Sequence, residues 1–230
     1  MKLSAVVLAR FLGFVETFDL NPLGRVFFPD LIPALVKRCN FQKFPKEYDD
    51  LDEQKGVEFL EGKWEGITVD TLTIYRNGII VDTRSSTADS EKILEETLVW
   101  AAKEFGITYR PGVIKREGYV SNLTFYSKIP LLSGLNDALS KLSTRIGNAT
   151  SQVVGHPLSF ETVGITMNHE WPQVAGRPIA AFTINRRIET PFSENKYFSE
   201  APLPTDLHIT LLQEFENELL STSGTTKPAR

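Results

Sequence analysis

The sequence predicts an α+β fold in which a mainly antiparallel sheet carries its helices chiefly on one face. Segments with alternating apolar residues are typical of strands, and segments with apolar residues every three or four positions are typical of helices. Both kinds occur along this chain. The dipeptide Asn77-Gly78 stands between two strand-like segments and predicts a tight two-residue hairpin turn with positive φ at both residues. Because a hairpin joins antiparallel strands, we expect an antiparallel sheet.

The first half of the chain predicts a strand, a helix, further strands and a second helix. Residues 3–18 are apolar on both alternating sets at their start and on one set later, which indicates a partly buried strand. Asp30 is the expected N-cap of a helix over 29–39. The second helix is expected to begin at a Ser86 or Thr87 cap and to end at Gly106. The strand-like segments between these helices are 57–60, 66–75 and 79–84.

The second half repeats the same order. It predicts strands over 118–127, 159–168 and 179–188, and helices over 131–147 and 205–220. With the short segment 57–60 left aside, each half has a strand, a helix, a strand pair and a helix, an order that resembles the ferredoxin-like arrangement. We therefore expect a single α+β unit over 1–220, which two ferredoxin-like halves at 1–106 and 107–220 could compose, and a flexible tail over 221–230. Whether the halves arose by duplication stays open.

The apolar faces of the predicted helices indicate which side chains fill the core. Such faces normally pack against a sheet. The loss of the Leu139 side chain in Leu139→Ala is therefore expected to cost about 2–5 kcal/mol of stability. The residues expected to be buried are Leu94, Leu98, Leu135, Leu139, Leu142, Leu211 and Phe215.

Composition and charge exclude some classes of protein. The net charge of −4 argues against a nucleic-acid-binding surface, because contacts with phosphate groups require an excess of Lys and Arg. Cys39 is the only cysteine, so no intrachain disulfide forms, and we expect a small buried apolar side chain. No apolar run approaches the ~18 residues that span a membrane. We expect a soluble cytoplasmic protein with no membrane contact.

No motif in the chain assigns a reaction. The sequence contains no phosphate-binding loop, no dinucleotide-binding glycine pattern and no G-x-S-x-G element. Its histidines, His156, His169 and His208, lack the short spacing of metal ligands. We therefore expect no metal and no cofactor, and we assign no catalytic residue.

Residues 189–204 form a long segment without apolar periodicity. Connections beyond about 12–15 residues without regular structure are uncommon in compact domains. The aromatic residues Phe192, Tyr197 and Phe198 argue against disorder. We expect an ordered segment anchored by Phe192 or Phe198, which either covers an open end of the core or carries a binding surface.

These observations favour a non-catalytic protein-interaction subunit or adaptor of a larger assembly, whose partner is another protein or a second copy. The surface is expected around the paired arginines that end the strand over 179–188 and around the segment that follows. An arginine there can bind an acidic group. The predicted binding residues are Arg186, Arg187, Lys196, Tyr197 and Phe198.

Two alternatives remain open. The first is an enzyme whose site is built by loops near 189–208, with His208, Glu194, Arg186 or Arg187 as candidates. The second is a protein that binds single-stranded nucleic acid on the sheet face, since bases stack on exposed aromatic rings. Its candidate residues are Tyr119, Phe125 and Tyr126, beside Lys115, Arg116 and Lys128.

Overall fold

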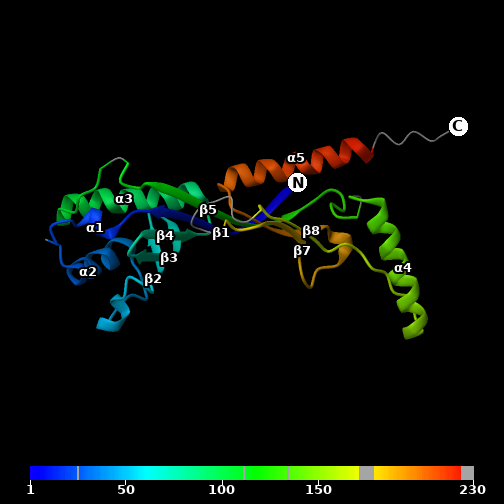
Figure 1. Ribbon diagram of the computed structural model, residues 1–230, viewed down its shortest axis with the longest axis horizontal. Coiled ribbons are helices and arrows are strands. Elements are labelled where there is room, and N and C mark those ends of the chain that lie inside the picture. The colour runs from blue at the N-terminus through cyan, green and yellow to red at the C-terminus, as the bar shows by residue number, and fades with distance from the viewer. Residues whose placement is uncertain (25, 111, 134, 171–178, 224–230) are drawn as a thin grey trace. The chain divides into compact units, whose positions relative to one another are not determined.

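The computed structural model describes residues 1–24, 26–110, 112–133, 135–170 and 179–223. Within these ranges the chain forms five α-helices and one antiparallel sheet of eight strands (Figure 1), which confirms the predicted α+β class. The strand order is β2-β3-β4-β1-β5-β8-β7-β6. The expected flexible tail reaches beyond this part of the chain, because residues 224–230 lie outside the described ranges.

The helices and strands have the following bounds. The strands are β1 (Lys2–Phe14), β2 (Val57–Trp64), β3 (Ile67–Tyr75), β4 (Gly78–Thr83), β5 (Arg116–Tyr126), β6 (Gly164–Met167), β7 (Phe182–Arg186) and β8 (Lys196–Ala201). The α-helices are α1 (Thr17–Leu20), α2 (Phe28–Cys39), α3 (Thr87–Phe105), α4 (Asp137–Val154) and α5 (Thr205–Ser223). Two short 3₁₀ helices are η1 (Tyr48–Leu51) and η2 (Phe192–Glu194).

Each half of the chain contains one strand more than the predicted order. The first half has β1, α2, then β2, β3 and β4, then α3, and the second has β5, α4, then β6, β7 and β8, then α5. The strand orders β2-β3-β4-β1 and β6-β7-β8-β5 correspond. Ferredoxin-like halves are therefore not confirmed. Duplication and the packing of the helices chiefly on one face remain predictions.

The described residues divide into two compact units, and we treat each by itself. Unit 1 comprises Met1–Ala5, Leu123–Ala201 and the chain from Leu207 onward. Unit 2 comprises Val6–Asn122 and Pro202–Asp206. Strands β1 and β5 contribute residues to both units, so the chain crosses from one unit to the other within regular structure.

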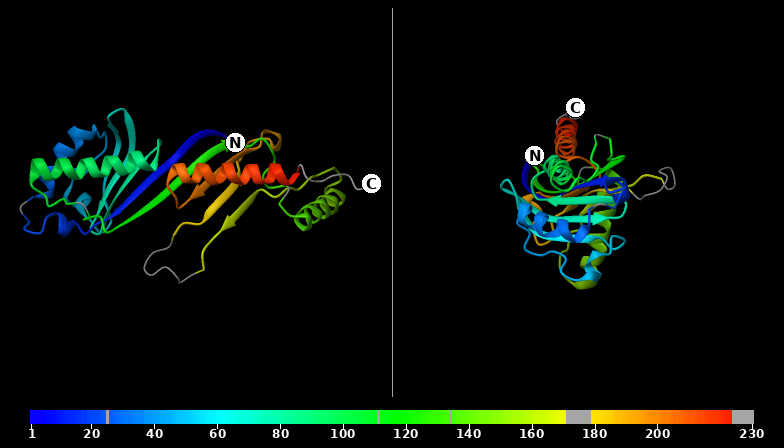
Figure 2. Two further views of the ribbon diagram at one scale, coloured as in Figure 1. Left: turned by 90° about the horizontal axis from the view of Figure 1, so that it is seen from above. Right: turned by 90° about the vertical axis from the view of Figure 1, so that its left-hand side faces the viewer.

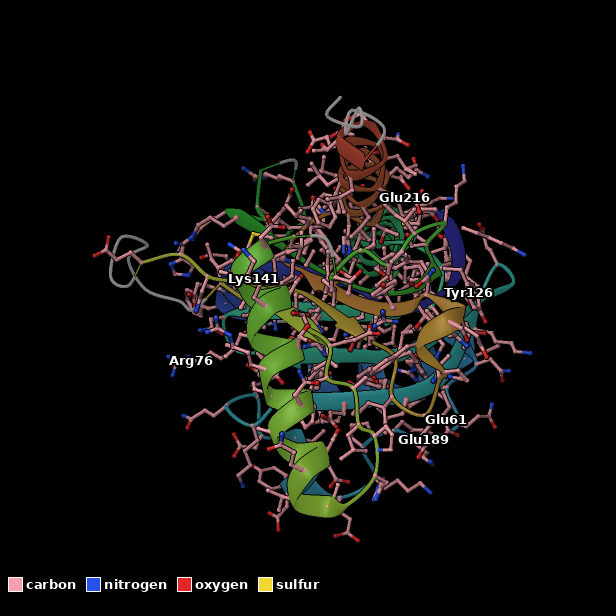
Figure 3. All side chains as sticks on the ribbon, turned by 90° about the vertical axis from the view of Figure 1, so that its right-hand side faces the viewer. Glu61, Arg76, Tyr126, Lys141, Glu189 and Glu216 are labelled. Carbon is pink, nitrogen blue, oxygen red and sulfur yellow. The ribbon has the colours of Figure 1, made fainter. Side chains whose placement is uncertain are left out.

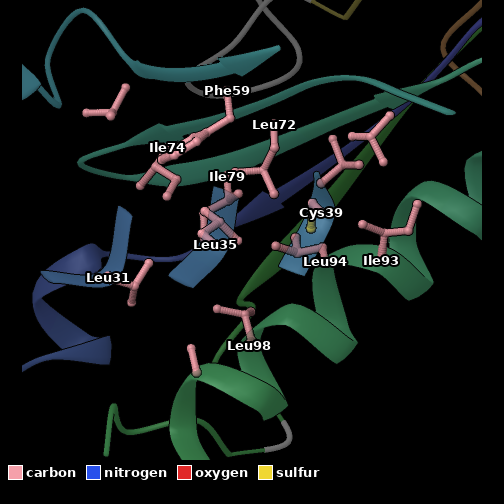
Figure 4. Close-up of a cluster of buried hydrophobic side chains, with 14 of the residues drawn as sticks. Leu31, Leu35, Cys39, Phe59, Leu72, Ile74, Ile79, Ile93, Leu94 and Leu98 are labelled. Carbon is pink, nitrogen blue, oxygen red and sulfur yellow. The ribbon is translucent and has the colours of Figure 1, made fainter. Parts of the chain in front are cut away.

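The core of unit 2 lies between α2, α3 and the β3–β4 hairpin. Figure 4 shows side chains of these elements pointing toward one another. Leu94 and Leu98 of α3 retain 0% and 4% exposure, as predicted. Cys39 is also fully buried, and this burial raises the pKa of its thiol to about 11, against a small opposing effect of Arg38. The thiol is therefore neutral and inert, which agrees with its expected role as an apolar side chain.

The predicted hairpin exists, but its turn is displaced by one residue. Tyr75 pairs with Gly78, so the two turn residues are Arg76 and Asn77, and neither Asn77 nor Gly78 has a positive φ. A Cβ atom at Gly78 would lie 3.1 Å from the Gly13 carbonyl oxygen of β1. This glycine therefore serves a close approach between strands, which the dipeptide pattern could not reveal.

A turn with positive φ at both residues instead connects β2 and β3. Trp64 pairs with Ile67, and the intervening Glu65 and Gly66 have φ values of 45° and 88°. These values are typical of a type I′ turn, whose twist matches that of the flanking strands.

The predicted ends of α3 are confirmed, whereas the predicted N-cap of α2 is wrong. The Ser86 side chain accepts a hydrogen bond from the Asp89 backbone N–H and caps α3, which ends before Gly106 with φ 77°. Helix α2, however, begins at Phe28 without a side-chain cap, so Asp30 lies in its first turn. Pro33 consequently lies within the helix.

Residues 189–204 are ordered, as predicted, but they are not irregular. They contain η2 and strand β8, which pairs with β7 from Arg186↔Tyr197 to Thr183↔Glu200. The anchor is neither Phe192, which is 42% exposed, nor the half-buried Phe198. It is Tyr197, which is fully buried. Alternation of Tyr197, Ser199 and Ala201 toward the interior defines this strand.

The predicted core of the other helices is largely wrong. Leu139 and Leu142 of α4 are 45% and 52% exposed, and Leu211 of α5 is 40% exposed. Leu135 and Phe215 are half-buried. Periodicity located the start of α5 correctly, whereas α4 spans 137–154 and not the predicted 131–147. It does not indicate whether an apolar face meets a sheet of the same chain.

Candidate functional site

The clearest surface feature of unit 1 is helix α4, whose apolar face is exposed. Leu139, Leu142, Ile146 and Val153 are 45%, 52%, 40% and 86% exposed. Their spacing of three, four and seven residues places them in one stripe along the helix. With Ala149 between Ile146 and Val153, the stripe follows the period of 3.5 residues that is typical of helices packed against other helices.

The opposite face of α4 packs against its own chain through small and polar groups. The Ser151 hydroxyl donates to the Gly147 carbonyl at 2.7 Å and accepts from the Leu158 backbone N–H at 2.8 Å. A Cβ atom on the buried Gly147 would lie 2.9 Å from the Leu158 carbonyl oxygen. The usual orientation of an amphipathic helix is thus reversed, with the small face inward and the apolar face outward.

Two positive charges accompany the apolar face. Lys141 and Arg145 are exposed and lie one turn apart on α4 (Figure 3, in which Lys141 is labelled). Asn136 caps the helix by accepting from the backbone N–H groups of Ala138 and Leu139 at 2.7 and 3.3 Å. Gly155, with φ 77°, ends it. Both ends of the helix are therefore locally fixed.

Unit 1 also carries an apolar groove of about 290 Å³ along helix α5. Figure 2 shows α5 beside the strands of this unit. Two lining residues at its rim, Met167 and Leu211, are 55% and 40% exposed, and the carboxylates of Glu214 and Glu218 on α5 are also exposed. The lining residues are all apolar: Ile165, Met167, Phe182, Ile184, Leu211, Leu212 and Phe215.

Two of the five predicted binding residues lie in the interior. Arg186 is 9% exposed, and its guanidinium donates to Glu161 Oε2 at 3.0 Å and to the Phe192 carbonyl at 2.9 Å. The Tyr197 hydroxyl accepts from the Leu131 backbone N–H at 3.0 Å, and the Tyr197 ring stacks on Phe125 at 5.7 Å. Both side chains hold unit 1 together.

The other three predicted residues remain accessible to different degrees. Arg187 is exposed, with its guanidinium 5.8 Å from the centre of the half-buried Phe198 ring. Lys196 is half-buried, with Nζ 5.1 Å from the centre of the Tyr126 ring. These cation–π contacts orient the two side chains. Their role in binding stays a prediction.

A serine and a histidine of unit 1 meet in a way that the sequence did not reveal. Ser199 Oγ lies 2.8 Å from His208 Nε2, and both residues are fully buried. The Ser199 hydroxyl donates to the Thr183 carbonyl at 2.6 Å. His208 Nε2 must therefore carry the proton of the Ser199–His208 bond, so it is not available as a base toward Ser199. This geometry is that of a structural contact.

The candidate nucleic-acid-binding aromatics are not exposed. Phe125 is fully buried, and Tyr119 and Tyr126 are half-buried. Burial and the nearby carboxylates raise the pKa of the Tyr119 phenol well above its ordinary value. The phenol shares its one proton between the carboxylates of Glu117 at 3.0 Å and Glu91 at 3.3 Å. Tyr119 and Phe125 thus resemble core side chains more than stacking platforms for bases.

No protein-family description matches this chain, and neither a curated protein nor a solved structure shows significant similarity to it. Within the described ranges, no helix has the length and apolar character needed to cross a membrane. The candidate site therefore depends on the geometry alone.

Proposed function

We propose that this is a non-catalytic interaction protein that self-associates, with helix α4 of one copy bound in the α5 groove of a second copy. The observation that carries the proposal is the exposed apolar stripe of α4. Water-exposed apolar surface of this extent is costly, and contiguous apolar surfaces on proteins commonly mark interaction sites. A cytoplasmic location and membership of a larger assembly belong to the same proposal.

The two surfaces are complementary in chemistry. An amphipathic helix with apolar residues at spacings of three and four is the usual occupant of an apolar groove. The α5 groove is lined by apolar side chains only, and two of them, Met167 and Leu211, are exposed. Lys141 and Arg145 beside the α4 stripe can pair with Glu214 and Glu218 beside the groove. Such rim charges fix orientation more than they add affinity.

This contact joins two different surfaces. We propose that two copies do not exchange it reciprocally, so that it does not close by a two-fold axis. Contacts of this kind generate rings or filaments. A symmetric α4–α4 pair would instead form a closed dimer, and a foreign protein partner would leave the isolated chain monomeric. The three arrangements can be distinguished by the oligomeric state of variants in the α4 stripe and in the α5 groove.

The test measures molar mass by light scattering after size exclusion. Leu142→Glu places a charge in the α4 stripe, and Leu211→Glu places one at the groove. Both side chains are substantially exposed, so the fold should be retained, as circular dichroism would verify. We expect the wild type to form assemblies larger than a dimer and each variant alone to be monomeric.

A mixture of the two variants gives the sharpest result. The Leu142→Glu copy retains its groove and the Leu211→Glu copy retains its α4, so one productive contact remains and the mixture should form dimers and nothing larger. Thr144→Glu and Gln213→Glu, at exposed positions outside the lining and the stripe, should assemble like the wild type. A monomeric wild type, or a Leu211→Glu variant that still dimerises, would overturn the proposal.

A further inference from the structure

The chain contains two methionines and one cysteine, and only one of these three side chains is largely exposed. Met167 is 55% exposed, whereas Met1 is half-buried and Cys39 is fully buried. A thioether reacts with a peroxide without losing a proton first, so the exposure of a methionine largely decides how readily it is oxidised. Met167 is therefore the sulfur-containing residue that a peroxide in solution reaches most easily.

Met167 lies at the rim of the α5 groove. It is the last residue of β6, it pairs with Phe182 of β7, and both residues line the groove. Strand β6 ends the strand order of the sheet, so no strand of the described residues covers Met167 on its other side. This position explains the exposure of Met167. It also puts the accessible thioether into the surface that receives helix α4 in the proposed contact.

Oxidation changes the chemistry of this surface. A peroxide transfers one oxygen atom to the Met167 sulfur, which loses two electrons and becomes a sulfoxide, while the peroxide is reduced to water or to an alcohol. The sulfoxide is polar and accepts hydrogen bonds, but neither the groove lining nor the α4 stripe contains a side chain that donates one. Water solvates the sulfoxide in a free groove. A bound α4 excludes this water and leaves the sulfoxide oxygen without a partner, which is unfavourable.

We infer that Met167 is a site of reversible oxidation that controls self-association, because the sulfoxide form of the groove binds helix α4 of a second copy much more weakly. This inference rests on the proposed contact between α4 and the α5 groove. The bound helix covers Met167, so association and oxidation oppose each other, and the thioether is oxidised in copies whose groove is free. Reduction of the sulfoxide restores the apolar groove.

The test measures the Kd of self-association by light scattering over a range of chain concentrations, before and after treatment with hydrogen peroxide. Mass spectrometry of the peptide that contains residue 167 verifies the oxidation. We expect oxidation to raise the Kd of the wild type at least about tenfold. Methionine sulfoxide reductases for both sulfoxide epimers should then restore the original Kd. Leu142→Glu, whose groove stays free, should be oxidised at least about threefold faster than the wild type at a concentration well above Kd.

Three variants separate the position of the thioether from its presence in the chain. Met167→Leu keeps the groove apolar without a sulfur atom, so its Kd, whatever the value, should be the same before and after peroxide. Met167→Gln places a polar group at the same site and should raise Kd without peroxide. A double variant with Met167→Leu and Leu23→Met carries its exposed thioether outside the groove, since Leu23 is 69% exposed. Oxidation of this variant should leave its Kd unchanged.

The outcomes distinguish this inference from the proposed function. A wild type that is monomeric before treatment would overturn both. The inference alone is overturned if the wild type has the same Kd before and after complete oxidation of residue 167, or if peroxide dissociates Met167→Leu. Resistance of Met167 to peroxide in Leu142→Glu would overturn it as well.

Discussion

Tyr197 illustrates how much one residue contributes to unit 1. Its ring is fully buried against Phe125 and the Arg186 guanidinium, and its hydroxyl is the acceptor for the Leu131 backbone N–H. The sequence placed Tyr197 in a binding segment because aromatic residues in loops often bind partners. Burial of a single residue depends on neighbours far along the chain, here residues more than 60 positions earlier, and local sequence does not contain that information.

The hydroxyl of Tyr197 should matter for stability. In Tyr197→Phe the Leu131 N–H loses its acceptor while remaining buried, so the free energy of unfolding should fall by about 1–3 kcal/mol. Urea denaturation followed by circular dichroism measures this change. Tyr48→Phe is the matched control, because Tyr48 is 89% exposed. A Tyr197→Phe variant as stable as the control would show that water or another group satisfies the Leu131 N–H.

At the scale of elements, the existence of the helices was predicted better than which of their faces are buried. The periodicity of α3 located that helix correctly, since amphipathic spacing is a local property. Helix α4 spans 137–154, so it begins six residues and ends seven residues later than the predicted helix over 131–147. Leu139 and Leu142 belong to the predicted apolar face, whereas Val153 lies beyond the predicted end of that helix at residue 147. Only the structure shows that α4 turns a small face, centred on Gly147, toward residues 157–160. Strand β8 was missed because prolines and polar residues flank a strand of only six residues.

The contrast between α3 and α4 gives a quantitative prediction. Leu94→Ala removes a fully buried side chain from the unit 2 core and should cost about 2–5 kcal/mol. Leu139→Ala removes an exposed one and should change the stability of the dilute, monomeric chain by less than about 0.5 kcal/mol. This replaces the larger cost expected from periodicity. Similar denaturant midpoints for the two variants would contradict the assigned environments of these helices.

At the scale of the whole molecule, the fold class was predictable, whereas the strand count was not. Alternation and amphipathic spacing gave the α+β class and most element positions. Each predicted strand pair is a strand triplet in the structure, because residues 57–60 show only a short strand pattern and residues 196–201 lie between prolines and polar residues. The correspondence between the halves is consequently closer in the structure than in the prediction.

Strands β1 and β5 contribute residues to both units, so we expect the two units to unfold together. Leu94→Ala, a change in unit 2, should therefore accelerate hydrogen exchange in peptides of β7 and β8 as well as in those of β3 and β4. Exchange monitored by mass spectrometry of the dilute, monomeric chain tests this, with Leu139→Ala as the control that accelerates neither. Faster exchange confined to β3 and β4 would mean that the units open independently.

Gly147 has a consequence for how this protein can change over evolutionary time. Any side chain there would collide with the Leu158 carbonyl oxygen, so the lineage can accept almost no substitution at that position. On the opposite side of the same helix, Leu, Ile, Val and Met could replace one another with little penalty as long as the stripe stays apolar. One face of α4 is thus constrained by side-chain size and the other by hydrophobicity. Related sequences should keep glycine at position 147 and vary among apolar residues in the stripe.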